Sequence, residues 1–551
     1  MPSRRLRNVP LLLLLCLLAV GQPALCIETA QPIPCLRWAH STTLAQSQGN
    51  NSNALWIFGG RATTTLGQAL NTWTNALLRM DLTAFSTSSP PLEVVNADRN
   101  ASNAPPRVAF GGLWSNEDGR SLYQTYGQFS DTPPETPSGN QLWKYDIPNN
   151  SWAAVQTSGV HPEGVAQGAQ ALVSDPTPNG QPTVYYFGGF LDSYTVPNWL
   201  GDKSYLSTMT TFDTSALKWQ NLTSYSKKGI SGSTNSTDNG VPPTQRAGAT
   251  LTHVPNLGTD KKGVLVMIGG DNADQMVDNQ VLDIYDVGSG AFVKQATQGD
   301  IMSSRIGHCA TRGSAYVNGA EQHQIFVYGG QTSNSTTLPL ENLSSDMYIL
   351  TLPSYTWTHV GNNLLGQPPA RASHTCDLIG DQMVVIGGQV NESILCEQPG
   401  VYIFNTTSLS WSTDFVPGNQ YTTPFLLANL TGGIGSSNTT GSSGWEVSDD
   451  AITSKSKSKV GPILGGIIGA IALGLLVLVL VHYRAKRQRQ RERVRWADRV
   501  FGARRMASSD DQEQERIRTA TYSDLKIPDI VGAVPMEPLT SPDRAHRRSA
   551  S

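Results

Sequence analysis

The heptapeptide QIFVYGG, residues 324–330, joins an apolar run rich in β-branched and aromatic residues to two glycines. Four other stretches have the same form: ALWIF before Gly59-Gly60, TVYYF before Gly188-Gly189, VLVMI before Gly269-Gly270 and QMVVI before Gly387-Gly388. A sixth stretch, LYQTY before Gly127-Gln128, is a degenerate copy. A short run bounded by glycine is typical of a buried strand, and the diglycine suits a turn in which φ is positive or a side chain would clash. The pattern therefore predicts six related buried strands.

Three further strands accompany each of these copies. A strand that ends on Asp or a polar substitute follows each diglycine: Met80-Asp81, Tyr145-Asp146, Phe212-Asp213, Tyr285-Asp286, Leu350-Thr351 and Phe404-Asn405. Six positions later, five copies have a large aromatic residue, which opens a fourth strand: Trp152, Trp219, Phe292, Trp357 and Trp411. In the first copy the aromatic residue is Phe85, only four positions after Asp81. The strand before the diglycine opens with an arginine in five copies: Arg37, Arg107, Arg246, Arg305 and Arg371. The third copy lacks this arginine and reads VAQGAQAL from Val165.

Four-stranded units that repeat six times between residues 36 and 417 are typical of a β-propeller. The combination of leading arginine, diglycine, Asp and aromatic residue resembles the kelch repeat of the galactose-oxidase-like superfamily. The resemblance implies an all-β, six-bladed kelch-like β-propeller ectodomain within residues 27–430, with the aromatic residues between neighbouring blades. Either the blades are whole or residues 27–34 add a strand to the last one.

Two apolar runs predict a membrane topology. Residues 1–26 combine three arginines with a short apolar run, which is the pattern of a cleaved signal peptide. Residues 460–483 contain twenty uncharged residues, about 30 Å of helix, and basic residues follow at once. We expect a single-pass type I membrane protein of the plasma membrane or secretory pathway. Its further parts are a Ser/Thr/Gly-rich stalk at 431–459, one transmembrane helix at 460–483 and a basic, disordered cytosolic tail at 484–551.

Charge and asparagine usage agree with this topology. The net charge of -3 divides into +3 over residues 1–26, -12 over residues 27–459 and +6 over the tail, and it argues against a nucleic-acid partner. All sequons precede the apolar run 460–483, which predicts a glycosylated exterior. They begin at Asn50, Asn100, Asn149, Asn221, Asn235, Asn334, Asn342, Asn391, Asn405, Asn429 and Asn438.

The cysteines predict two disulfides in an oxidising compartment. Cys16 leaves with the signal peptide, and Cys26 leaves too if cleavage follows it. Cys376 and Cys396 flank one diglycine strand, so we favour a bridge between them. Cys35 and Cys309 then pair by elimination, although four cysteines allow three connectivities.

Arginines and histidines of the repeat are the candidate site residues. By resemblance, Arg37, Arg107, Arg246, Arg305 and Arg371 line the mouth of a central channel and bind acidic groups of a ligand. Alternatively, each arginine bonds a carbonyl of the neighbouring blade. His40, His308 and His374 each follow a leading arginine by three residues. They are either hydrogen-bonded strand residues or a three-histidine metal site, and no Asp, Glu or Cys cluster supports the metal.

The sequence suggests two functions for this chain. The first is a non-catalytic cell-surface protein that binds a protein or glycan ligand through propeller loops, including those at 192–207 and 227–242, with an adhesion, cell-wall or signalling role. The alternative is a copper-radical oxidase of the galactose-oxidase type. The chain lacks the Tyr-His dipeptide and the C-terminal domain of that class, and no catalytic or cofactor motif was found.

Two further partners were predicted from the segments around the span. The small residues Gly461, Gly465 and Gly469 suit helix pairing into a homodimer. The basic run Arg484–Arg505 suits anionic membrane lipids. The chain as a whole is similar to kelch-domain surface proteins of filamentous fungi.

Overall fold

The computed structural model describes ten stretches of the chain: residues 35–46, 53–63, 72–96, 103–138, 142–159, 164–174, 182–222, 243–332, 342–361 and 364–427. The chain divides into two units, Met1–Ile452 and Thr453–Ser551, and every described residue belongs to the first. The predicted signal peptide, stalk, transmembrane helix, tail, glycine pair sites and basic run lie outside the described residues. Among the described residues, no helix is both long and apolar enough to cross a membrane.

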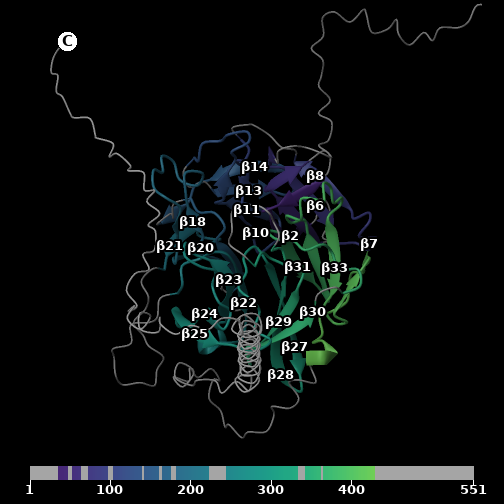
Figure 1. The fold of residues 1–551 in the computed structure, drawn as a ribbon. Coiled ribbons are helices and arrows are strands. Elements are labelled where there is room, and N and C mark those ends of the chain that lie inside the picture. The colour runs from purple at the N-terminus through teal and green to yellow at the C-terminus, as the bar shows by residue number, and fades with distance from the viewer. Residues whose placement is uncertain are drawn as a thin grey trace, which may run out of the picture. The chain divides into compact units, whose positions relative to one another are not determined.

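The described residues form mainly antiparallel sheets, six of which have four or five strands (Figure 1). From the innermost strand outward, sheet 1 contains β2 (Ser41–Gln46), β3 (Asn53–Phe58), β6 (Leu77–Asp81) and β8 (Leu92–Asn96). Sheet 2 contains β10 (Gly112–Ser115), β11 (Ser121–Thr125), β13 (Leu142–Asp146) and β14 (Ser151–Val155). Sheet 3 contains β16 (Ala169–Val173), β17 (Thr183–Phe187), β20 (Met209–Asp213), β21 (Lys218–Asn221) and β15 (Ser158–Gly159).

The second half of the domain repeats this order. Sheet 4 contains β22 (Ala247–Val254), β23 (Val264–Asp271), β24 (Val281–Asp286) and β25 (Ala291–Ala296). Sheet 5 contains β27 (Cys309–Val317), β28 (Ala320–Tyr328), β29 (Met347–Leu352), β30 (Thr356–Gly361) and β26 (Gln298–Gly299). Sheet 6 contains β31 (Thr375–Ile379), β32 (Gln382–Ile386), β33 (Val401–Asn405) and β34 (Ser410–Ser412). The strands β15 and β26 are parallel additions to the outer edges of their sheets.

Short ribbons connect or flank these sheets. They are β1 (Leu36–Trp38) with β4 (Arg61–Thr63) and β5 (Thr72–Trp73), β9 (Val108–Ala109) with β12 (Gln128–Phe129), β18 (Phe190–Leu191) with β19 (Ser204–Tyr205), and β7 (Phe85–Ser86) with β35 (Asp414–Phe415). A 3-10 helix, η1, spans Thr259–Lys261. Phe85 thus lies in a ribbon with the end of the domain, and the outer strand of sheet 1 is β8. The prediction that Phe85 opens that strand was wrong, because an insertion separates them.

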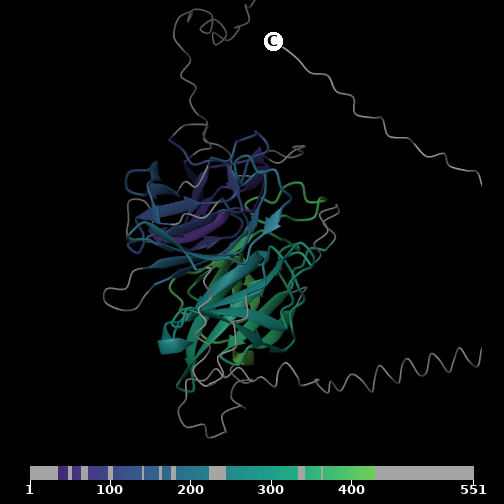
Figure 2. The same cartoon turned by 90° about the vertical axis from the view of Figure 1, so that its left-hand side faces the viewer.

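A closed cycle of six backbone hydrogen bonds joins the inner ends of the sheets. The donors and acceptors are Ala39 to Ser373, Ser373 to Gly307, Gly307 to Gly248, Gly248 to Gln167, Gln167 to Phe110 and Phe110 to Ala39, at 2.6–3.0 Å. We call these six residues the amide ring. The sheets follow one another around it in chain order, so that the green sheet 6 lies beside the purple sheet 1 (Figure 1). In the view turned by 90°, purple and blue sheets again lie together above the teal and green ones (Figure 2). The fold is therefore all-β and of the propeller type.

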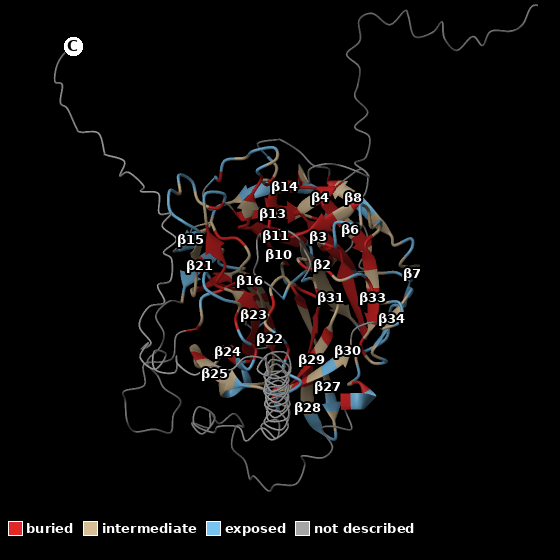
Figure 3. Ribbon diagram, in the orientation of Figure 1, coloured by how far each residue is buried: buried red, intermediate tan, exposed pale blue. Residues whose placement is uncertain are grey.

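The core lies between neighbouring sheets, where aromatic residues of the fourth strands pack. Trp152 contacts Phe58 of sheet 1 at 5.3 Å between ring centroids, and Trp219 contacts Tyr126 beside sheet 2 at 5.4 Å. Phe292 packs on Phe187 in the same way at 5.9 Å. Buried residues gather on second strands such as β3 and β32, while the fourth strand β14 exposes three of its five residues (Figure 3). The predicted place of these aromatic residues between sheets is confirmed.

All four predicted cysteines form disulfides, but the predicted pairing was wrong. The bonds are Cys35–Cys396 and Cys309–Cys376. Cys309 and Cys376 lie in β27 and β31, the innermost strands of neighbouring sheets, with 5.7 Å between their Cα atoms. Cys396 lies in the loop between β32 and β33, where its neighbour Glu397 hydrogen-bonds the carbonyl of Cys35. Flanking one strand in sequence therefore did not bring Cys376 and Cys396 together.

Candidate functional site

The second strands end at a turn whose backbone is the same in all six sheets. The first glycine of each diglycine has φ between 58° and 70°, and the second has φ between 89° and 110°. In sheet 2 the matching residues are Tyr126, with φ of 58°, and Gly127, with φ of 112°. The degenerate copy is therefore Tyr126-Gly127 rather than the predicted Gly127-Gln128. We call the end of the sheets at which these turns lie the diglycine face.

Each turn holds the next sheet by a backbone hydrogen bond. The second residue of the turn donates its N–H to a carbonyl that stands two residues before a member of the amide ring. These pairs are Gly60 to Val108, Gly127 to Val165, Gly189 to Arg246, Gly270 to Arg305, Gly330 to Arg371 and Gly388 to Arg37, at 2.8–2.9 Å. We call the six acceptors the leading positions. Four of them are arginines, and the two valines are adjacent in the chain order of the sheets.

The leading arginines of sheets 4, 5 and 6 occupy one kind of site, the arginine slot. Nε of Arg246, Arg305 and Arg371 donates to the carbonyl two residues earlier, at 3.0, 3.2 and 3.1 Å. Nη1 donates to the carbonyl of the first glycine of the same sheet, at 3.2, 2.9 and 2.7 Å. An acidic side chain completes each slot: Asp283, Asp346 and Glu397 respectively. All three arginine side chains are at most 2% exposed.

These contacts agree with the alternative expectation that each arginine bonds a backbone carbonyl rather than a ligand. The carbonyl, however, belongs to the arginine's own sheet and not to the neighbouring one. Arg37 is also buried. Arg107 stands one residue before the leading position Val108, and its backbone N–H and guanidinium contact Glu135 at 3.0 and 2.7 Å. The prediction that Arg107 belongs to the ring was wrong, because the leading position is the next residue, Val108. Ligand binding by the five arginines remains a prediction.

The three repeat histidines pack against the first glycine of the preceding sheet. A Cβ on Gly329 would lie 2.6 Å from His374 Cε1, and one on Gly269 would lie 2.6 Å from His308 Cε1. Nε2 of His308 shares a hydrogen bond with Thr250 Oγ1 at 3.1 Å, and burial together with Arg305 lowers the pKa of His308 to about 3. His40 lies in the same way against Gly387. Within the described stretches, no group of three or more His, Cys, Asp or Glu side chains could hold a metal ion.

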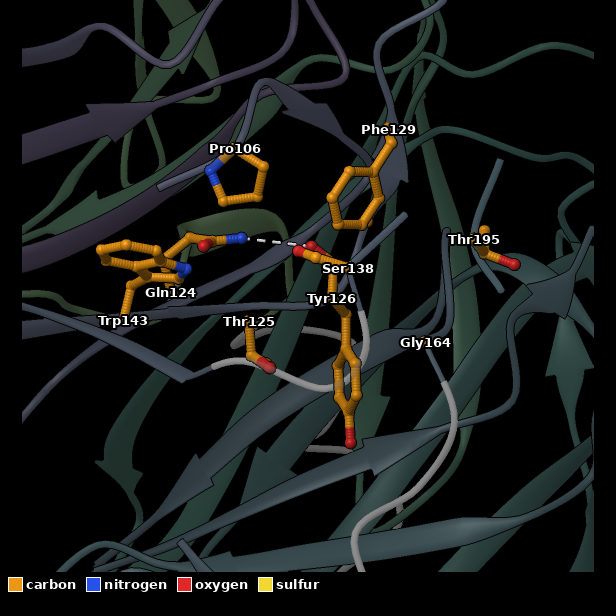
Figure 4. Close-up of a pocket in the computed structure, with 10 residues that line it drawn as sticks. Pro106, Gln124, Thr125, Tyr126, Phe129, Ser138, Trp143, Gly164 and Thr195 are labelled. Atoms are coloured by element: carbon orange, nitrogen blue, oxygen red, sulfur yellow. Dashed lines mark hydrogen bonds between the residues drawn. The ribbon is translucent and has the colours of Figure 1, made fainter. Parts of the chain in front are cut away.

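A cavity opens at the diglycine end of sheet 2. It comprises about 360 Å³ of space outside protein atoms, nearly all of which is open solvent or gaps narrower than a water molecule. Gln124 and Thr125 lie buried in it, Pro106, Phe129 and Trp143 provide apolar walls, and the exposed Ser138 lies at its rim. Figure 4 shows the Gln124 amide between Trp143 and the backbone of Tyr126, where its Nε2 donates to the Tyr126 carbonyl at 3.1 Å.

The diglycine face also carries the longest loops of the domain. Because the strands are antiparallel, the connections between second and third strands and those from each fourth strand to the next sheet all lie there. Exposed large apolar residues on these connections are Tyr194, Leu200, Ile301, Leu365 and Leu395. Of the two loops predicted to bind a ligand, 192–207 lies on this face, and 227–242 lies outside the described residues.

Five of the predicted sequons fall within the described residues. Asn149, Asn221, Asn342 and Asn391 are exposed. Asn405 is half-buried, and its Nδ2 donates to Asp381 Oδ2 at 3.0 Å while its Oδ1 accepts from the N–H groups of Thr407 and Ser408. The other sequons lie outside the described residues, and glycosylation at all eleven remains a prediction.

Comparison with known proteins identifies the fold family. A family profile described as Attractin/LZTR1 beta-propeller matches residues 138–426. The chain belongs to this family. A kelch repeat-containing protein of Arthroderma benhamiae is 32% identical over 410 residues, which are 70% of this chain and 57% of that protein. The comparisons confirm the kelch-type propeller that the repeat predicted.

More distant relatives share shorter segments. A Rab9 effector protein with kelch motifs from Bos taurus is 23% identical over 175 residues, which are 31% of this chain and 42% of that protein. Multiple epidermal growth factor-like domains protein 8 of Mus musculus is 28% identical over 132 residues, 24% of this chain and 4% of that protein. The chain thus spans less than two thirds of the length of these relatives.

The sequence did not point to the sheet-2 cavity of this Attractin/LZTR1-type propeller. Gln124 and Trp143 look like ordinary strand residues, and neither belongs to the repeat signature. The available signal was that copies two and three depart from the repeat side by side, in Tyr126, Val108 and Val165. Where two neighbouring copies lack the residues of the repeat, the contacts that those residues make in the other copies are absent. Such a place is where a cavity can form.

Proposed function

We propose that this chain is a non-catalytic, six-bladed propeller that binds another protein through its diglycine face. The six-membered amide ring supports the number of blades, because each member lies at the start of the innermost strand of a different sheet or two residues before it. The exposed apolar residues on the loops of that face carry the proposal of binding, because a partner that covers the face would remove their side chains from water. The name of the Rab9 effector relative supports a protein as the partner class.

The test is proximity labelling with a peroxidase fused to the full-length chain, followed by binding of the recovered partner to variants. We expect Tyr194→Ser with Leu200→Ser to weaken binding at least tenfold, because both side chains leave the solvent on binding. Tyr316→Ser is the matched control, since Tyr316 is 75% exposed on the hairpin at the opposite end of sheet 5. Equal losses in both variants, or no loss in the first, would contradict the proposal.

We further propose the type I topology that the two apolar runs and the sequons support, with the propeller outside the cytosol and a role in adhesion, cell-wall contact or signalling. A glycan ligand, helix pairing through the glycines at 461, 465 and 469, and lipid contact by the basic run belong to the same proposal. In sealed vesicles, an endoglycosidase should shift the propeller only after lysis, and protease added outside should remove a tail epitope. The reverse protection pattern would exclude this orientation.

A further inference from the structure

Sheet 2 contains an arginine slot that has no arginine of its own. In sheet 4, the slot is formed by the carbonyl of Thr244, the carbonyl of Gly269 and the side chain of Asp283. The residues at these three positions in sheet 2 are Pro106, Tyr126 and Trp143. The register supports this correspondence, since Trp143 pairs with Gln124 as Asp283 pairs with Met267, two residues before the first residue of each turn.

Neither Val108, the leading residue of sheet 2, nor Arg107 before it fills this slot. The leading residue is Val108, whose Cβ would lie 2.8 Å from a Cβ on Gly127, much as the Cβ of Arg246 would lie 3.2 Å from one on Gly270. Val108 is therefore placed as the arginine is, but its side chain is too short to reach the carbonyls. Arg107 contacts Glu135 instead. In sheet 3, where Val165 leads, Tyr186 is buried and its hydroxyl accepts from the N–H of Gly168.

The sheet-2 slot keeps polar atoms that lack a partner among the described residues. Gln124 Oε1 and Trp143 Nε1 are buried without a hydrogen bond, and their residues are 2% and 5% exposed. Other buried side chains in the described part of the domain, Trp152 and Trp357 among them, also leave one atom without a partner there. The slot is therefore distinguished by two such atoms that line one cavity, where a ligand or water can satisfy both. Figure 4 shows Gln124 and Trp143 side by side in the cavity, with Phe129 and Pro106 above them.

The chemistry of the slot suits a cation that is carried by a peptide. Gln124 Oε1 can accept a hydrogen bond, and the aromatic walls Trp143 and Phe129 attract a planar cation. Asp192, which bonds Gln128 and Thr195 near the rim, is an acidic neighbour, while Arg107 is neutralised by Glu135. The indole N–H of Trp143 is a donor, which a free guanidinium cannot use but a peptide carbonyl can.

We propose that the sheet-2 slot binds an arginine side chain of a partner protein, in the place that sheets 4, 5 and 6 fill with their own arginines. The inference rests on the proposed protein-binding function and names the chemistry of the partner. The guanidinium donates to Gln124 Oε1 and the backbone carbonyls of the slot, and it stacks against Trp143. The partner is therefore expected to present an exposed arginine at the centre of its contact with sheet 2.

The test measures binding of blocked pentapeptides to the full-length chain by calorimetry. The peptides carry arginine, lysine or citrulline at the central position between alanines, and methylguanidinium serves as the free cation. We expect the arginine peptide to bind at least tenfold more tightly than the other three, because citrulline lacks the charge, lysine lacks the planar fork and methylguanidinium lacks the peptide carbonyl. Equal binding of citrulline, or no binding of the arginine peptide at millimolar concentration, would overturn the proposal.

Two variants locate the peptide. Gln124→Met copies Met267 of sheet 4 and should weaken the arginine peptide at least tenfold, whereas Gln220→Met on the exposed outer strand of sheet 3 should not. Val108→Arg should fill the slot from within the chain and abolish peptide binding. An unchanged affinity in Gln124→Met would also overturn the proposal. If a partner found by labelling still binds this variant and loses affinity with Tyr194→Ser and Leu200→Ser, the slot proposal fails while the proposed function stands.

Discussion

At Gly329, a single Cβ atom decides whether the diglycine turn can form. The residue has φ of 68°, and an added Cβ would lie 2.6 Å from His374 Cε1 and 2.8 Å from the carbonyl oxygen of Arg371. Gly319 also has positive φ, 81°, but an added Cβ there would meet nothing within 4 Å. The two glycines therefore separate backbone strain from steric conflict. Where no histidine follows, at Gly59 and Gly188, an added Cβ would still lie 2.7 and 2.3 Å from a carbonyl oxygen of the residue that leads the next hydrogen-bonded segment.

We expect Gly329→Ala to lower the free energy of unfolding by about 2–4 kcal/mol, since it adds overpacking to the strain of positive φ. Gly319→Ala should lower it by only about 1 kcal/mol, which is the strain alone. Urea denaturation of the purified full-length protein, followed by tryptophan fluorescence, measures both. Equal losses in the two variants would show that the contact with His374 does not restrict the turn.

The buried histidines make stability depend on pH in a defined direction. Burial and the neighbouring arginines lower the pKa of His40 and of His308 to about 3 in the folded protein, whereas both titrate near 6.5 when unfolded. Between these values the unfolded chain binds more protons than the folded one. The free energy of unfolding contributed by each histidine is therefore complete above pH 6.5 and is lost progressively as the pH falls toward 3.

His308→Gln should remove the contribution of one titrating histidine to the pH dependence of the free energy of unfolding. We expect the variant to be less stable at pH 7, because the hydrogen bond to Thr250 changes, but to lose less stability than the wild type between pH 6.5 and pH 4. His359→Gln is the control, since the His359 side chain is 34% exposed. Unfolding measured at a series of pH values gives the slopes, and parallel curves for His308→Gln and wild type would contradict the assignment.

At the scale of elements, the two disulfides tie together parts that the sheets alone leave separate. Cys309–Cys376 joins the innermost strands of sheets 5 and 6, and Cys35–Cys396 joins the segment before β1 to a loop of sheet 6. Peptide mapping without reduction should recover these two pairs and neither alternative pairing. Replacing Cys309 and Cys376 by alanine should lower the free energy of unfolding by about 2–5 kcal/mol while Cys35–Cys396 still forms. Recovery of Cys376 linked to Cys396 in that mapping would refute the connectivity.

The elements that could be predicted from sequence are those that need one particular kind of residue at a fixed position. Five diglycine strands were found because glycine dominates at positive φ, and the aromatic residues between sheets were found by their constant spacing. Sheet 2 was misaligned because Tyr126 adopts positive φ although it is not glycine. The copy was placed at Gly127-Gln128, one position late, and Arg107 was included in the ring although Val108 holds the leading position. The outer strand of sheet 1 was missed because an insertion moved β8 away from Phe85.

The candidate site was harder to predict because it is defined by the absence of an arginine that other sheets have. Arg246, Arg305 and Arg371 were recognised from the repeat, but their burial depends on carbonyls and acids brought together by separate strands. Gln124 Nε2 donates one hydrogen bond to the Tyr126 carbonyl, while its Oε1 has no partner among the described residues. Nothing in the local sequence distinguishes that glutamine from a surface residue of a strand. Only the pairing of β11 with β13, which places it beside Trp143, reveals its role.

At the scale of the whole molecule, the ring is closed where the last sheet meets the first. The amide of Ala39 donates to Ser373, and His40 Nε2 shares a hydrogen bond with Thr375 Oγ1 at 3.0 Å. Thr42 Oγ1 donates to Asp377 Oδ2 at 2.7 Å. These contacts join residues more than 330 positions apart, so they form only after all intervening sheets are in place. The seam between sheets 6 and 1 is therefore where the cooperativity of the ring can be measured.

Asp377 provides that measurement, because burial at the seam raises its pKa to about 6. The folded protein then binds more protons than the unfolded chain between pH 4 and pH 6, so this group makes the free energy of unfolding fall as the pH rises through that range. Above pH 6 the carboxylate, which is half-buried in β31, destabilises the closed ring by about 2 kcal/mol. The sign is opposite to that of the histidines.

Asp377→Asn keeps an acceptor for Thr42 and removes the charge. We expect it to raise the free energy of unfolding at pH 7.5 by about 2 kcal/mol, with the gain vanishing below pH 4, where Asp377 is protonated in both states. Asp414→Asn, at an exposed residue of β35, should have no such effect. Unfolding curves at both pH values decide the matter: a gain that persists at pH 4 would mean that the substitution acts through packing rather than charge. A gain confined to neutral pH would mean that an ionised group buried at the seam limits the stability of the whole ring.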